Sequence, residues 1–124
     1  MMVKTLATIA VVEDDAGVRT ALQQLLRSAE YEALVFASAE EFLATRDRIE
    51  VDCLVADINL PGMSGVALVK TLAAGVEGVP AVLITGRDDP NTMELIRQAG
   101  PVPRLRKPFS DDELFDAIHA AMGG

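Results

Sequence analysis

The stretch Cys53-Leu54-Val55-Ala56-Asp57 decides the fold, because it is an apolar run that ends at a carboxylate. Three other apolar runs along the chain also end at polar groups. Residues 9–12 stop at Glu13, Asp14 and Asp15, residues 81–84 stop at Thr85, and residues 102–105 lead to Lys107. If the runs are parallel strands of one sheet, these polar groups gather at one edge, where open α/β sheets bind ligands.

Helical patterns fill the intervals between the apolar runs. From Val18 to Ala29, apolar residues recur at the spacing of one helix face. Two capping boxes, Ser38 to Glu41 and Ser110 to Glu113, predict the starts of two further helices. The remaining two helices are expected over residues 64–73, after the Pro61-Gly62 turn, and from Asp89-Pro90 to Gly100.

The order of these patterns is a strict alternation of strand and helix, which predicts an α/β fold with a doubly wound, five-stranded parallel sheet. A short run at residues 33–36 ends in Ala37-Ser38 without a charged group, so we expect this strand to lie away from the site. The last run contains Pro101 and Pro103, which are tolerated at a sheet edge. Both observations favour the flavodoxin-like strand order 2-1-3-4-5, with five helices on both faces.

The composition is that of a single domain. The chain of 124 residues is 50% hydrophobic but only 4% aromatic, which is typical of buried parallel strands between helices. We expect residues 1–124 to form one domain with a core over about residues 7–122. A net charge of -8, from 19 acidic and 11 basic residues, argues against direct binding of nucleic acid.

The chain has no features of a secreted or membrane protein. Its N-terminus does not resemble a secretory signal, and no apolar stretch approaches the roughly 18 residues of a membrane span. Its one cysteine, Cys53, is expected to be a buried small hydrophobe. We therefore expect a soluble cytoplasmic protein that does not contact a membrane.

The carboxylates at the ends of the first and third runs would lie close together and repel one another. A hard divalent cation removes this repulsion, and Mg²⁺ suits a site of carboxylates, waters and a phosphate oxygen. Such a metal would also screen an incoming phosphoryl group. Asp57 is the natural nucleophile for an aspartyl phosphate, with Lys107 adding a positive charge and Thr85 a hydroxyl.

These residues carry a resemblance to a known family. The segments that carry it are Val11-Val12-Glu13-Asp14-Asp15, Asp52 to Gly65, Ile84-Thr85-Gly86 and Lys107-Pro108-Phe109. They closely resemble the response-regulator receiver domains of bacterial two-component signalling, and the likeness extends from Ala7 to Met122. The segments Phe36 to Leu43 and Ile84 to Arg87 look like those of receivers that precede a helix-turn-helix output domain.

The resemblance implies a role for each site residue. Asp57 matches the phosphoacceptor, Glu13 and Asp14 match the acidic pair that holds Mg²⁺, and Asn59 would offer the metal its backbone carbonyl. Thr85 matches the hydroxyl that moves onto the phosphoryl group, and Lys107 matches the lysine that contacts it. The Lys107-Pro108 bond would be cis by the same analogy. Asp15 is expected to be a helix cap rather than a ligand.

Three positions bear on how the switch would work. Receivers usually carry an aromatic residue three positions before the lysine, but this chain has Arg104 there. A guanidinium is not buried cheaply without a partner, so we expect Arg104 at the surface, reporting the switch through a changed charge partner. Asn59 and Arg87 match positions where side chains of receiver domains influence how water reaches the phosphorus, so we expect Arg87→Ala to alter autodephosphorylation.

Three classes of function stay in comparison. The first is a non-enzymatic, phosphorylation-dependent signalling switch. The second is a small aspartate-nucleophile phosphatase, but such enzymes resemble a pattern with a second Asp two residues after the nucleophile, where this chain has Asn59. The third is a phosphorylation-silent pseudo-receiver, which would be expected to lack Asp57, the acidic pair or Lys107.

The implied partners are a sensor histidine kinase or phosphotransfer protein, and a downstream protein or effector domain. A second copy of the chain, in a phosphorylation-dependent homodimer, is a further implied partner. In receivers the fourth helix, fifth strand and fifth helix form the usual output face. That face offers Met93, Arg97, Arg104, Phe115 and His119. His119 is expected to be an exposed helical residue without a phosphotransfer role. Two arrangements stay open, a stand-alone receiver and the N-terminal part of a longer regulator.

Overall fold

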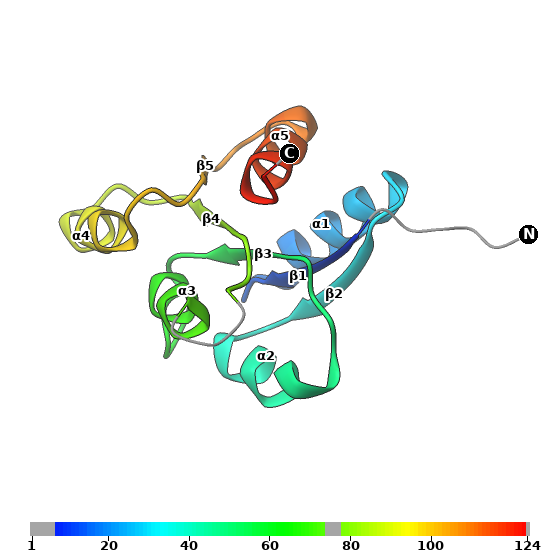
Figure 1. Ribbon diagram of the computed structural model, residues 1–124. Helices are drawn as coiled ribbons and strands as arrows, with labels where there is room; N and C mark the ends of the chain where they lie inside the picture. The colour runs from blue at the N-terminus through cyan, green and yellow to red at the C-terminus, as the bar shows by residue number, and fades with distance from the viewer. Residues whose placement is uncertain (1–6, 74–77, 124) are drawn as a thin grey trace, which may run out of the picture.

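The computed structural model describes residues 7–73 and 78–123, and in them one parallel sheet lies between two layers of helices (Figure 1). The strands are β1 (Thr8–Val12), β2 (Glu32–Phe36), β3 (Cys53–Asp57), β4 (Ala81–Thr85) and β5 (Arg104–Arg106). The helices are α1 (Ala16–Ser28), α2 (Ala39–Thr45), α3 (Gly65–Ala73), α4 (Pro90–Ala99) and α5 (Asp111–Ala121), with a short 3₁₀ turn η1 (Arg46–Arg48). The strand order is β2-β1-β3-β4-β5, as predicted.

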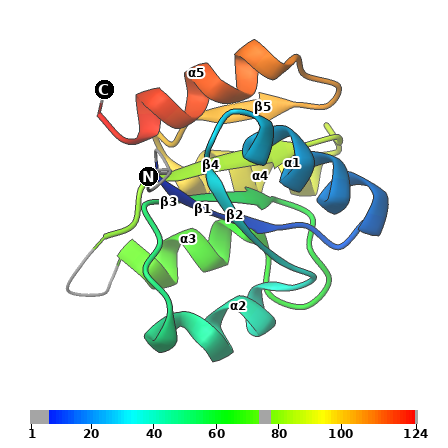
Figure 2. The ribbon, with the colours of Figure 1, turned by 90° about the vertical axis from the view of Figure 1, so that its right-hand side faces the viewer.

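The central strands β1, β3 and β4 are apolar on both faces, and each face of the sheet has its own core. Successive side chains of a strand point to opposite sides of the sheet, so Val55 and Ala56 enter different cores. Phe42 and Leu68 bring α2 and α3 into one core, while Leu22, Leu26, Leu114 and Ile118 bring α1 and α5 into the other. Figure 2 shows α1 and α5 together on one side of the sheet, opposite α2 and α3.

Most of the predicted helix signals are in place. Asp15 caps α1 by accepting a hydrogen bond from the Val18 backbone N–H, and Asp89 caps α4 with Pro90 in the first turn. Ser110 and Glu113 form the expected reciprocal capping box. The prediction for Ser38 was half right. Its hydroxyl accepts from the Glu41 N–H, but the Glu41 carboxylate accepts a hydrogen bond from the Ala37 N–H, one residue before the cap.

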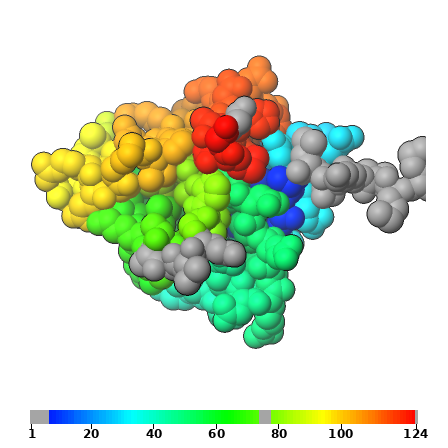
Figure 3. All heavy atoms as spheres, in the orientation of Figure 1, coloured from blue at the N-terminus to red at the C-terminus, as the bar shows by residue number. Residues whose placement is uncertain are grey.

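The prediction for the last strand was right in place and wrong in extent. β5 lies at the sheet edge, but it begins at Arg104, so Pro101 and Pro103 precede it rather than lying within it. A proline has no N–H for the ladder, yet the Pro103 carbonyl still accepts a hydrogen bond from the Leu83 N–H. In Figure 3 the last turn of α5 (red) lies near this segment (orange), where residues 101–103 and Ala120 line one hollow.

The carboxyl ends of β1, β3 and β4 lie side by side at one end of the sheet, across the strands. Val12 pairs with Ala56, and Asp57 pairs with Ile84, so the residues that follow these strands are neighbours in space. Arg106 pairs with Thr85 and brings Lys107 to the same end. Among the described residues, no helix is long and apolar enough to cross a membrane.

Candidate functional site

The loop after β1 supplies two acids of different exposure. Glu13 is only 1% exposed, whereas Asp14 is exposed. Arg19, on α1, donates from Nη1 to the carbonyl oxygens of Glu13 at 2.9 Å and Asp14 at 3.4 Å. The guanidinium therefore holds the backbone that presents both carboxylates. The sequence pattern gave no sign of this role, because a charged residue on a surface helix is usually solvated.

Asp57 ends β3 and is 6% exposed. Its Oδ1 accepts a hydrogen bond from the Asn59 backbone N–H at 2.8 Å, so the turn after the strand fixes the carboxylate. Gly65 makes this turn possible, since a Cβ there would lie 2.3 Å from the Asp57 carbonyl oxygen. Gly65 matters here for its lack of a side chain, a role that spacing alone does not reveal.

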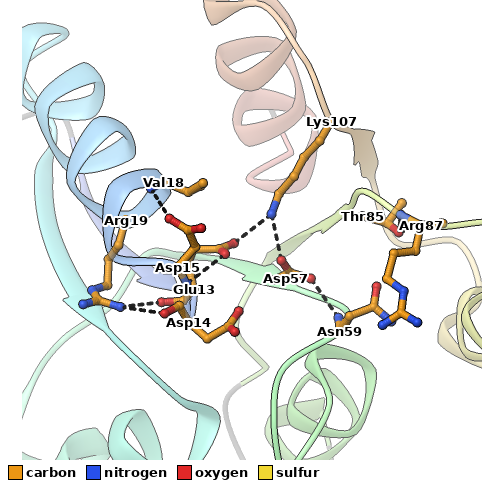
Figure 4. Close-up of polar contacts among 10 residues, drawn as sticks. All are labelled: Glu13, Asp14, Asp15, Val18, Arg19, Asp57, Asn59, Thr85, Arg87 and Lys107. Carbon is orange, nitrogen blue, oxygen red and sulfur yellow. Dashed lines mark hydrogen bonds and ion pairs between the residues drawn. The ribbon is translucent and has the colours of Figure 1, made fainter.

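Lys107 bridges the two buried acids. Its Nζ donates to Asp57 Oδ2 at 2.9 Å and to Glu13 Oε2 at 3.3 Å (Figure 4). Burial alone would lower the pKa of Lys107, but the hydrogen bond and charge of Asp57, helped by Glu13, raise it above its usual range. The ammonium is therefore a fixed positive charge between the two carboxylates. The Lys107-Pro108 bond is cis, as expected.

The three carboxylates form a compact cluster. One oxygen from each of Glu13, Asp14 and Asp57 lies within 4.8 Å of the others. Burial, and then the negative charge of Asp57, raises the pKa of Glu13 from 4.5 to about 7, although Lys107 opposes the rise. A single lysine thus leaves the cluster short of positive charge. Oxygen ligands that carry excess negative charge fit a hard divalent cation such as Mg²⁺.

Thr85 lies beside this cluster, but its hydroxyl is hydrogen-bonded to the loop that follows β4. Its hydroxyl donates to the Arg87 carbonyl at 2.9 Å and accepts from the Arg87 N–H at 3.1 Å. Figure 4 shows Thr85 next to Arg87, apart from the contacts of Asp57 and Lys107. The structure therefore brings Glu13, Asp14, Asp57 and Lys107 together, with Asn59 contacting Asp57 through its N–H, and does not bring the Thr85 hydroxyl into contact with them.

The remaining predictions concern side chains near the site. Arg104 is exposed, as expected for a guanidinium at this position. Cys53 is buried, and burial raises the pKa of its thiol to about 12, so the thiol is unreactive at neutral pH. His119 is exposed, and its Nε2 lies 3.1 Å from the Tyr31 hydroxyl.

Comparisons with known proteins show which family this chain resembles. The family model described as the response regulator receiver domain matches residues 9–119. The chain is 42% identical over 118 residues to nodulation protein W of Bradyrhizobium diazoefficiens, covering 94% of this chain and 52% of that protein. It is 36% identical over 115 residues to the transcriptional regulatory protein FixJ of the same organism, covering 92% of this chain and 56% of that protein.

A solved structure agrees in fold. Full-length FixJ from B. japonicum superposes with a TM-score of 0.85 at 33% identity, covering 97% of this chain and 59% of FixJ. The chain thus spans a little more than half the length of nodulation protein W and of FixJ.

Proposed function

The chain belongs to the response regulator receiver domain family, and from that premise we propose that Asp57 is its phosphoacceptor in a phosphorylation-dependent signalling switch. The donor is a sensor histidine kinase or a phosphotransfer protein. The observation that carries the proposal is a buried carboxylate at the end of β3, held by Lys107 and by the Asn59 N–H beside two further acids.

In the proposed transfer, an Asp57 carboxylate oxygen attacks the phosphorus of a phosphohistidine. The O–P bond forms as the P–N bond breaks, and the electron pair returns to the imidazole nitrogen, which takes a proton from solvent. Lys107 Nζ already contacts Asp57 Oδ2, so it can turn its positive charge to a phosphoryl oxygen. The Thr85 hydroxyl can then leave Arg87 and donate to another phosphoryl oxygen.

We assign the metal site to the carboxylates of Glu13, Asp14 and Asp57 and the backbone carbonyl of Asn59. The donor set fits Mg²⁺, because the three carboxylates converge and burial raises the pKa of Glu13 to about 7. Bound Mg²⁺ supplies positive charge that reduces the repulsion between the acids and the anionic phosphoryl group. The chain itself contributes Arg19, which holds the loop of the acidic pair.

The test is covalent labelling of Asp57. The full chain is incubated with Mg²⁺ and either acetyl phosphate or phosphoramidate, and its intact mass is measured. We expect a gain of one phosphoryl group that disappears in Asp57→Ala and on chelation of the metal. Asp88→Asn, at an exposed loop residue, is the matched control and should label normally. Labelling that persists in Asp57→Ala, or that neither donor produces, would reject the proposal.

For the output we propose the α4-β5-α5 face, where Met93 is 51% exposed and Arg104 is exposed. Phosphorylation would change binding there to a downstream protein, to an effector domain or to a second copy of the chain. The domain would act in the cytoplasm, as residues 1–124 of a longer transcriptional regulator. Support comes from FixJ, which is named a transcriptional regulatory protein and of which 56% is covered. Sequencing the gene beyond Gly124 tests this part directly.

A further inference from the structure

We propose that Thr92, in the first turn of α4, is a positioning residue of this switch. Its hydroxyl ties the turn after Asp57 to the loop that holds the Thr85 hydroxyl away from the site. This inference rests on the proposed roles of Asp57 and Thr85, and it adds a residue outside the motifs of the sequence.

The Thr92 hydroxyl is fully buried between two polar partners. Its Oγ1 lies 3.0 Å from the Asn59 Nδ2 and 2.8 Å from the Asp89 Oδ1. An ionised carboxylate can only accept hydrogen bonds, and the hydrogen bond from Thr92 is the largest effect holding the pKa of Asp89 below its usual range. The single hydroxyl proton therefore points to Asp89, and Oγ1 accepts from the Asn59 amide.

On the Asn59 side, the contact reaches the phosphoacceptor. The Asn59 backbone N–H donates to Asp57 Oδ1, while its side chain is held by Thr92. Because Thr92 fixes which end of the amide faces it, Asn59 Oδ1 is left as a buried acceptor with no hydrogen bond to the described residues. An amide in this state is sensitive to the loss of its one partner.

On the Asp89 side, the contact reaches the switch hydroxyl. Asp89 Oδ1 also lies 3.2 Å from the Arg87 Nε, and the Arg87 backbone makes both hydrogen bonds to Thr85. Polar contacts therefore run without interruption from Asp57 through Asn59, Thr92, Asp89 and Arg87 to Thr85. The two groups that the proposed reaction uses are joined through the start of α4.

These contacts favour the resting position of Thr85. Its only hydroxyl proton is donated to the Arg87 carbonyl, so it cannot reach a phosphoryl oxygen until that bond breaks. The Arg87–Asp89 ion pair is exposed and is weak by itself. Thr92 is the fully buried residue in this series of contacts, so no water replaces a hydrogen-bond partner that is lost there. Removing its hydroxyl should take away one hydrogen bond of Asp89 and so loosen the loop that retains Thr85.

The test compares Thr92→Val, which removes the hydroxyl at similar volume, with Thr92→Ser, which keeps it. The backbone N–H at position 92, from which Asp89 accepts, is retained in both. The probe is beryllofluoride with saturating Mg²⁺, titrated by NMR on the Arg87 and Thr85 amides. Loss of the hydrogen bond from the Thr92 hydroxyl to Asp89 predicts about three- to tenfold tighter beryllofluoride binding for Thr92→Val. Thr92→Ser should resemble the wild type.

A double-mutant cycle separates positioning from general loosening of the fold. Arg87→Gln removes the ion pair at the surface and should by itself tighten beryllofluoride binding. Adding Thr92→Val to Arg87→Gln should then have little further effect on the release of Thr85, because the contacts of Thr92 and Arg87 that retain Thr85 meet at Asp89. Unchanged or weaker binding for Thr92→Val, or fully additive effects, overturns the inference. If Thr92→Val does not fold, the titration of Arg87→Gln with beryllofluoride still tests whether the contacts of Asp89 retain Thr85.

The same titration distinguishes this failure from failure of the proposed function. If wild-type protein binds beryllofluoride and labels at Asp57 but Thr92→Val matches it, only the role of Thr92 is wrong. If wild-type protein does neither, the proposed function itself is wrong and the role of Thr92 falls with it.

Discussion

Glu13 is a carboxylate whose protonation should change the stability of the whole domain. Its pKa rises to about 7 in the folded protein because it is buried beside Asp57. In the unfolded chain the value is near 4.5, so the folded state binds the proton more tightly. Its contribution to stability is therefore present at about pH 4.5 and is lost as the pH rises through about 7. This is the reverse of a carboxylate whose pKa is lowered on folding, because burial and Asp57 outweigh the ion pair of Glu13 with Lys107.

Glu13→Gln should remove that loss, since the amide does not ionise. In the absence of divalent cations we expect the variant to gain about 1–3 kcal/mol over wild type at pH 8, given that one pKa unit corresponds to 1.36 kcal/mol. At pH 5 the two proteins should be nearly equal. Urea unfolding at both pH values measures the difference, with exposed Glu50→Gln as the control. Equal stabilities at pH 8 would contradict the prediction.

Arg19 should matter for metal binding without being a ligand. Its Nη1 holds the carbonyl oxygens of Glu13 and Asp14, and loss of these bonds lets the acidic loop move. We expect Arg19→Gln to weaken Mg²⁺ binding about three- to tenfold, the effect of one or two ordinary hydrogen bonds. Calorimetric titration with Mg²⁺ measures this. Arg27→Gln, also on α1 but exposed, should bind as the wild type does.

At the scale of the elements, the turn between β3 and α3 depends on Gly65. A Cβ at this position would collide with the Asp57 carbonyl oxygen, and backbone cannot move aside as a flexible side chain can. Gly65→Ala should therefore lower the free energy of unfolding by about 1–3 kcal/mol, the usual effect of overpacking. It should also slow labelling of Asp57 by acetyl phosphate.

The matched control for this change is Gly78→Ala, where a Cβ would enter open space. Urea unfolding and the rate of mass gain are measured for both variants. A Gly65→Ala protein that is as stable and as reactive as Gly78→Ala would show that the close approach is unimportant.

The elements were the part of the structure most accessible from the sequence. Apolar runs that end at polar residues predicted the strand ends, because a parallel strand buried on both faces reads as a nearly continuous apolar run. The polar residues are Glu13, Asp57, Thr85 and Lys107. The length of β5 was not predictable in the same way. Pro101 and Pro103 can precede a strand or lie at its edge, and only the pairing of Arg104 with Leu83 settles which.

The parts of the site that were missed depend on side-chain direction. The sequence identifies Thr85 as a hydroxyl at a strand end, but its bonds to Arg87 depend on a rotamer that the spacing does not determine. Thr92 follows a capping Asp89 and reads as an ordinary residue of a helix start. Its burial comes from packing against the loop of Asn59, which is 33 residues away in the chain.

At the scale of the whole molecule, a signal at the site has a short path to the surface. Arg106 of β5 pairs with Thr85 of β4 in the sheet. Arg104 is exposed and lies two residues before Arg106 on the same edge strand. When Mg²⁺ and beryllofluoride are added, we expect the NMR signals of the Arg104 backbone and guanidinium to shift. Arg48, in η1, should remain unchanged. Stationary Arg104 signals in a protein that binds the mimic would remove Arg104 as a reporter.

The edge of the sheet formed by β5 exposes charged side chains. β5 is only three residues long, follows two prolines and carries Arg104 and Arg106 on either side of buried Leu105. Short, charged edges with nearby prolines are poor templates for the addition of a foreign strand. Arg104 and Arg106 thus help to protect the sheet from edge-to-edge aggregation, and replacing Arg104 to test the proposed output face would also remove a safeguard of solubility.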